Sequence, residues 1–65
     1  MHMAVPGMVI RVLGKNKDTV EVQFSDGVIT AKNIMPELQV GDYVILSNNM
    51  VIQRITEMEA RRFGL

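Results

Sequence analysis

The chain has 65 residues, no cysteine, and equal numbers of basic and acidic side chains, seven of each. This length allows one domain with a small core, and the lack of cysteine excludes disulfide bonds as a means of stabilising it. The charge balance argues against nucleic-acid binding as a main role, because a phosphate backbone is recognised through an excess of lysine and arginine.

The first seven residues, Met1 to Gly7, are apolar and nearly uncharged, and they end in a Pro-Gly pair. We expect residues 1–6 to form a flexible tail in front of a compact scaffold. They lack the basic segment and apolar run of a signal peptide, and the chain has no apolar stretch long enough for a membrane helix. These features predict a cytoplasmic protein that does not bind membranes.

The segment from residue 7 to residue 54 predicts five short strands joined by polar turns. Hydrophobic and polar residues alternate most clearly in the segment 19–24, which places Val20, Val22 and Phe24 on a buried face. Pro36 prevents a central strand between residues 34 and 39, so this segment is expected to cross one end of a barrel. The expected strands cover residues 7–13, 19–24, 28–33, 43–46 and 50–54.

The last ten residues predict a short helix, at about 56–65. Thr56 and Glu59 have the spacing of a capping box, and Ile55, Met58 and Leu65 can line one face. Such a short helix must dock on another surface to be stable. Together the elements predict an all-β fold class: a small five-stranded OB-like barrel with a short C-terminal α-helix, forming one domain over residues 1–65.

No arrangement of side chains in the sequence indicates catalysis. The only histidine is His2, and neither Ser25 nor Ser47 has a histidine and a carboxylate at a suggestive spacing. We therefore expect a protein that is not an enzyme and has no catalytic residues. His2 can be a solvated terminal residue, a remnant of cloning, or a metal ligand that acts with the Met3 thioether and with groups of a partner.

Three motifs carry a resemblance to a known family and together span nearly the whole chain. They are Met-x-x-Ala-Val-Pro-Gly at residues 1–7, Val-Gly-Asp-Tyr-Val-Ile at 40–45, and Ile-Gln-Arg-Ile at 52–55 before the acidic helix. In these motifs the chain resembles the HypC/HupF hydrogenase maturation chaperones. The resemblance implies an OB-like barrel with a C-terminal helix. It also implies two partners: a HypD-like iron-scaffold maturation protein and the precursor of the hydrogenase large subunit.

The same resemblance implies that the cargo is iron with cyanide and carbon monoxide ligands, handled transiently and not bound as a stable cofactor. Relatives begin Met-Cys and expose the cysteine by losing the initiator methionine, whereas this chain has His2, which is expected to leave Met1 in place. Relatives also carry a histidine where this chain has Ser47. A neutral imidazole is a weaker iron ligand than a thiolate.

Three explanations fit these departures: His2 is an introduced change at a natural cysteine, the chain is a paralogue that binds the same partners without handling iron, or it uses His2 at another metallocentre. We favour the paralogue. The first functional hypothesis is therefore a maturation chaperone that docks through its N-terminal residues. The alternatives are an OB-type nucleic-acid binder, for which Tyr43 is the one free stacking platform, and a structural or regulatory subunit. The expected partner-binding residues are His2, Met3, Ala4, Val5, Pro6 and Gly7, with His2 also the candidate metal ligand.

Overall fold

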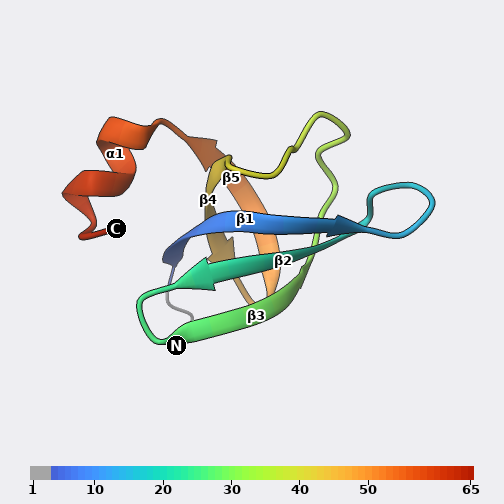
Figure 1. The fold of residues 1–65 in the computed structure, drawn as a ribbon, viewed down its shortest axis with the longest axis horizontal. Helices are drawn as coiled ribbons and strands as arrows, with labels where there is room; N and C mark the ends of the chain where they lie inside the picture. Colours follow the sequence, from blue (N-terminus) through green and yellow to red (C-terminus); the bar gives the residue numbers. More distant parts are fainter. Residues whose placement is uncertain (1–3) are drawn as a thin grey trace.

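A computed structural model describes residues 4–65 of the chain (Figure 1). Five strands close into a barrel in the order β1-β2-β3-β5-β4, and one helix follows the last strand. This is the OB-like barrel with a C-terminal helix that the sequence predicts. In the part of the chain that the structure describes, no helix is long and apolar enough to cross a membrane. The elements are β1 (Val5–Leu13), β2 (Thr19–Phe24), β3 (Gly27–Lys32), β4 (Tyr43–Ser47), β5 (Met50–Ile55) and α1 (Glu57–Arg62).

Strand β1 is the longest strand and belongs to two ladders. Its second half pairs with β2, beginning at Met8, and its first half pairs with β4. The register shifts between Val9 and Arg11, where a bulge lets the strand bend from one ladder into the other. Strands β1, β2 and β3 form an antiparallel meander, while β3 meets β5 in parallel and only at the pair Lys32 and Met50.

The N-terminal strand begins earlier than the sequence predicts. Val5 and Pro6 pair with Leu46 and Ile45 of β4, so the prediction of a flexible tail over residues 1–6 is wrong at its last two positions. The Pro-Gly pair does not stop the strand. At this point β1 pairs with β4 alone, and a proline is tolerated on an edge strand because its missing N–H is not needed there.

The barrel interior is filled by the inward faces of the strands and by one residue from a loop. Leu38, in the connection between β3 and β4, is only 2% exposed and packs in the same core cluster as the strand residues. Burial of each such side chain contributes roughly 1.5–3 kcal/mol. Phe24, expected to be buried by alternation, is only half-buried at the end of β2. The core consists of Val9, Val20, Val22, Ala31, Leu38, Val44, Leu46 and Val51.

The connection between β3 and β4 is held by the buried side chain of Asn33. Its Nδ2 donates to the carbonyl oxygens of Lys17 and Met35, at 3.0 and 2.8 Å. Its Oδ1 accepts from the Met35 N–H at 2.9 Å. The expected crossing at this end of the barrel is present, and Asn33 fastens it to the loop between β1 and β2.

Helix α1 begins at the capping box that the sequence predicts. The Thr56 hydroxyl accepts from the Glu59 N–H at 3.1 Å, and the Glu59 carboxylate accepts from the Thr56 N–H at 3.0 Å. The helix ends at Arg62, earlier than the predicted residue 65, because Phe63 is the C-cap and Gly64 turns away with φ of +90°.

The predicted docking face of the helix is confirmed at Ile55 but wrong at Met58. Met58 is 68% exposed, whereas Ala60 is fully buried in a small cluster with Ile45 and Ile55. Tyr43 packs against this cluster. The helix therefore lies at one end of the molecule, opposite the loop between β1 and β2 (Figure 1), and contacts the barrel through a small side chain.

Candidate functional site

The structure describes four of the six predicted partner-binding residues, Ala4 to Gly7. His2 and Met3 lie outside the described residues. Ala4 is exposed and precedes the first strand, while Val5 and Pro6 are half-buried within it. The predicted docking segment is thus divided into an exposed beginning and a base that is part of the barrel.

Gly7 fixes the base of this segment against two neighbouring strands. It is buried and pairs with Val44, and it faces β2 on its other side. A Cβ atom at this position would overlap the Val22 side chain and would lie 2.9 Å from the Gln23 carbonyl oxygen. Only glycine leaves room for this close approach of the backbones. The chain in front of Gly7 therefore leaves the barrel along a defined path.

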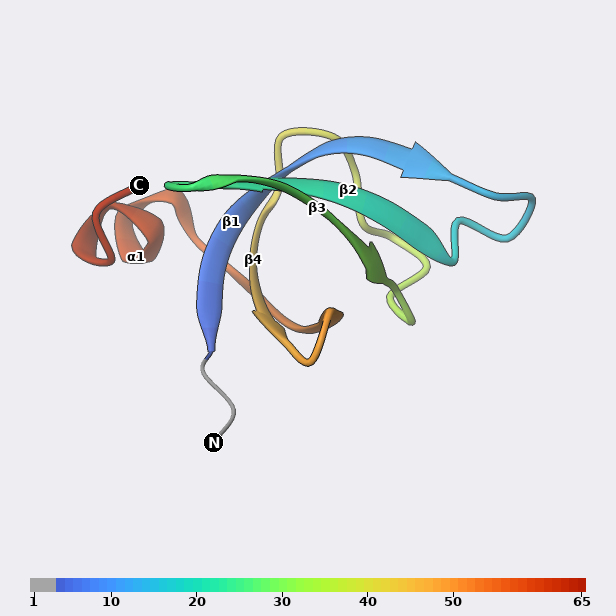
Figure 2. The same cartoon turned by 90° about the horizontal axis from the view of Figure 1, so that it is seen from below.

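That path leads to the turn between β4 and β5. Val5 pairs with Leu46, so continuation of the same antiparallel register places Ala4 opposite Ser47. Ser47 is the position at which the resemblance implies a histidine in relatives. Asn48 and Asn49 follow with φ of +53° and +59°, which forms the tight turn into Met50. In Figure 2 the described start of β1 and this turn project from the same side of the barrel.

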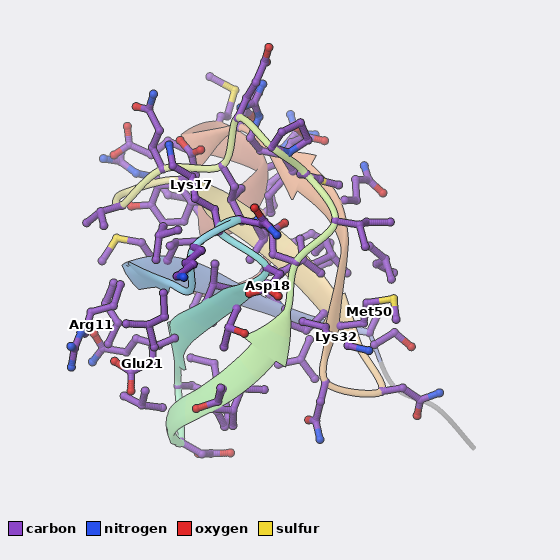
Figure 3. All side chains as sticks on the ribbon, turned by 90° about the vertical axis from the view of Figure 1, so that its right-hand side faces the viewer. Arg11, Lys17, Asp18, Glu21, Lys32 and Met50 are labelled. Carbon is purple, nitrogen blue, oxygen red and sulfur yellow. The ribbon has the colours of Figure 1, made fainter. Side chains whose placement is uncertain are left out.

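We call Ala4, the segment 47–50 and Lys32 the N-terminal rim. Lys32 joins the rim because its N–H donates to the Asn49 carbonyl oxygen at 2.8 Å. Figure 3 shows Lys32 and Met50 side by side where β3 meets β5. Met50 is 37% exposed and adds an adaptable apolar contact to a surface whose other described side chains are mostly small and polar. Such a mixed surface suits a protein partner better than a nucleic acid.

The described rim offers little to a transition metal. Within residues 4–65, no group of three histidine, cysteine, aspartate or glutamate side chains could hold a metal ion. The rim side chains are a hydroxyl, two amides, a thioether and an ammonium group, and none of them is a strong iron ligand. Any metal chemistry at this site would depend on His2 and on groups supplied by a partner.

The aromatic and basic side chains do not form a nucleic-acid surface. Tyr43, the expected stacking platform, is half-buried by the packing of α1. Phe24 and Tyr43 line a shallow groove beside Leu65, while Phe63 is 60% exposed on the helix C-cap.

Ion pairs further reduce the free positive charge. Three of the four arginines pair with carboxylates: Arg11 with Glu21 at 3.4 Å, Arg54 with Asp42 at 3.7 Å, and Arg61 with Glu57 at 3.3 Å. The first pair joins β1 and β2 and lies on the opposite side of the view in Figure 3 from Lys32 and Met50.

The sequence motifs identify the N-terminal segment but not its neighbours. Nothing in the sequence joins residue 4 to residue 47, because this proximity depends on the register between β1 and β4. The Asn48-Asn49 pair is a signal for a tight turn, but its position beside the N-terminus follows only from closure of the barrel.

The model of the HupF/HypC family matches residues 1–63. A comparison with curated proteins found no match. The match includes the N-terminal segment, the strand that carries Ser47 and the capped helix.

Proposed function

The chain belongs to the HupF/HypC family, whose members are hydrogenase maturation chaperones, and on this basis we propose that it docks on its partners through residues 2–7. The first partner is a HypD-like iron-scaffold maturation protein, and the second is the precursor of the hydrogenase large subunit. The process served is assembly of a nickel–iron active site. No catalytic step is assigned to the chain itself.

The observation that carries this proposal is the anchored base of the N-terminal segment. Val5, Pro6 and Gly7 pair with β4, and Gly7 also abuts β2. A docking element that leaves a rigid surface in one direction loses less conformational entropy on binding than a free tail of the same length. The adjacent rim, with Met50 and Lys32, supplies a second contact surface beside the exposed start of the segment.

We further propose that the chain binds these partners without carrying the iron itself. The support is chemical: position 2 is histidine and position 47 is serine, where relatives have a thiolate and an imidazole. The iron with its cyanide and carbon monoxide ligands would then stay on the scaffold protein. His2 would serve as a polar docking residue.

The docking proposal is tested with a chain that begins at Val5. Removal of residues 1–4 spares every strand pair of β1, so the barrel should keep its stability. We expect the shortened chain to bind a HypD-like protein at least about tenfold more weakly than the full chain in calorimetric titrations. The matched control is Met58→Ala, which changes an exposed side chain on α1 and should leave binding unchanged. Equal affinity of the full and shortened chains would overturn the docking role.

The iron proposal is tested by restoring the family residues. The His2→Cys/Ser47→His double variant should co-purify with iron after expression with the scaffold protein. The parent chain should not, and a Ser47→His variant alone serves as the control. Iron measured by mass spectrometry and cyanide or carbon monoxide bands in the infrared spectrum provide the readout. Iron carried equally by the parent and the double variant would show that positions 2 and 47 do not decide iron handling.

A further inference from the structure

Strand β3 has an edge that the barrel leaves open. On one side it pairs with β2 along its whole length, from Gly27 to Lys32. On the other side, within residues 4–65, β3 pairs with Met50 of β5 alone, through Lys32. In Figure 3 β3 diverges from β5 beyond this point, and in Figure 1 it forms the lower margin of the barrel. In the part of the chain that the structure describes, no strand pairs with the edge from Gly27 to Ala31.

Alternation of the backbone shows which groups face this edge. The Lys32 N–H donates to Asn49 at the start of the hairpin, so the backbone groups of Lys32 point away from β2. Along an antiparallel strand the backbone groups of every second residue point the same way, so those of Val28 and Thr30 also face the open edge. Among the described residues, no backbone hydrogen bond to Val28 or Thr30 occurs outside the strands.

The sequence of this edge is complementary to itself. When two copies of β3 lie antiparallel about Ile29, Val28 of one copy stands opposite Thr30 of the other, and the reverse pair forms as well. Both residues present their backbone groups outward, so these two pairs can form four hydrogen bonds. A register centred on Val28 pairs Val28 of one copy with Val28 of the other and no further outward-facing residues of β3. A register centred on Thr30 would require Lys32 to pair with Val28 of the second copy, but Lys32 already pairs with Met50 and its N–H is bonded to Asn49.

The same register brings opposite charges together. Asp26, in the turn before β3, falls beside Lys32 of the second copy, and this happens twice across the two-fold axis. Both side chains are exposed, and neither forms an ion pair with another described residue. On the outer face Val28, which is 51% exposed, would be covered next to Thr30 of the second copy. Hydrogen bonding, charge and apolar contact therefore favour one register.

We propose that two copies of the chain associate by antiparallel β3–β3 pairing centred on Ile29, independently of the function proposed above. The arrangement is isologous, as expected for a two-fold dimer. It involves one short strand from each copy, so its interface is at the small end of specific interfaces. The dimer should therefore form and dissociate with protein concentration and not be permanent.

Sedimentation velocity over a wide concentration range tests the proposal with the full chain. The mass should rise from that of one 7.3 kDa chain toward twice that value as concentration increases. A Thr30→Pro variant removes one outward N–H without removing a bond to β2, and it should stay monomeric at every concentration. Thr30→Val retains that N–H and is the matched control, which should dimerise like the parent.

A charge exchange distinguishes the proposed register from any other contact. Asp26→Lys and Lys32→Asp should each weaken the dimer by about tenfold, because two attractive pairs become repulsive. The double variant Asp26→Lys/Lys32→Asp should recover most of the loss. These three variants decide the question even if Thr30→Pro fails to fold, which circular dichroism would show. A parent that is monomeric throughout, or a double variant no better than the single ones, would overturn the proposal.

Discussion

Gly7 shows how a single residue shapes the candidate site. The sequence predicts that it begins the first strand, and the structure adds a second role, as the place where β1 approaches β2 too closely for a side chain. A Pro-Gly pair is typical of a turn, so the sequence around Gly7 does not predict a close contact between strands. The close approach depends on the packing of β1 against both β2 and β4, and a local sequence pattern cannot predict such a long-range contact.

A Gly7→Ala substitution should destabilise the barrel by roughly 1–3 kcal/mol, because the added methyl group overlaps Val22 and crowds a backbone oxygen. Urea unfolding followed by circular dichroism measures this loss. Val22→Ala should also destabilise, by opening a cavity in the core. Combined with Val22→Ala, the Gly7 substitution should cost less than it does alone, since the new methyl group then enters vacated space. Strict additivity of the two effects would contradict this explanation.

Asn33 is a second residue whose role sequence reasoning missed. It was assigned to the end of a strand, where an asparagine is unremarkable, yet it is 5% exposed and fastens two loops. Its acceptor contact with Met35, two residues later, is a local turn of a kind that asparagine favours. That contact could be anticipated from the sequence, whereas the bond to Lys17 could not, because it joins residues 16 apart.

At the scale of elements, the strands were predicted well because period-two alternation and turn residues are local signals. The helix start was also local, since Thr56 and Glu59 interact within one turn. The docking face of the helix was predicted correctly at Ile55 and wrongly at Met58. Apolar spacing favoured the large Met58, but the helix residue buried against Ile45 and Ile55 is the small Ala60.

Substitutions at these two positions should therefore have opposite consequences. Ala60→Leu should destabilise the protein by about 1–3 kcal/mol, because the larger side chain cannot be accommodated against Ile45 and Ile55. Met58→Ala should change stability by less than about 0.5 kcal/mol, since Met58 is mainly in solvent. Thermal unfolding of both variants provides the comparison. A larger loss for Met58→Ala than for Ala60→Leu would mean that the helix docks through its other face.

The capping box should make the helix sensitive to acid. The hydrogen bond from the Thr56 backbone N–H is the main cause that holds the pKa of the Glu59 carboxyl below its ordinary value, and the Thr56 side chain lowers it further. Desolvation opposes this effect, and the positive charge of Arg62 makes a smaller contribution in the same direction as Thr56. A carboxyl whose pKa is lowered by folding stabilises the folded state above its unfolded pKa. That contribution is lost as the pH falls through the folded pKa.

Glu59→Gln provides the test, because glutamine keeps an oxygen that can accept from the Thr56 N–H but does not titrate. Between neutral pH and about pH 3, the melting temperature of the parent should fall more than that of Glu59→Gln. Other carboxylates titrate in both proteins, so the difference between the two curves isolates Glu59. Parallel curves over this range would show that the cap does not depend on the charge.

At the scale of the whole molecule, the fold class and the family were predictable, because the motifs span the chain and the family match covers residues 1–63. The surroundings of the N-terminal segment were not. Barrel closure through β1 and β4 brings Ala4 to the turn at Ser47, and the divergence of β3 from β5 leaves one edge open. Both features are long-range consequences of topology, and both concern the surfaces on which partners are proposed to bind.

The proposed function depends on docking of partners at the N-terminal segment and the N-terminal rim. Titration of an isotope-labelled full chain with a HypD-like protein, followed by amide NMR spectra, tests it most directly. We predict that the perturbed amides concentrate at Ala4, Val5 and Gly7, at residues 47–50 and at Lys32, while those of α1 stay in place. Perturbations confined to α1 and its groove beside Tyr43, with the rim unchanged, would contradict the account.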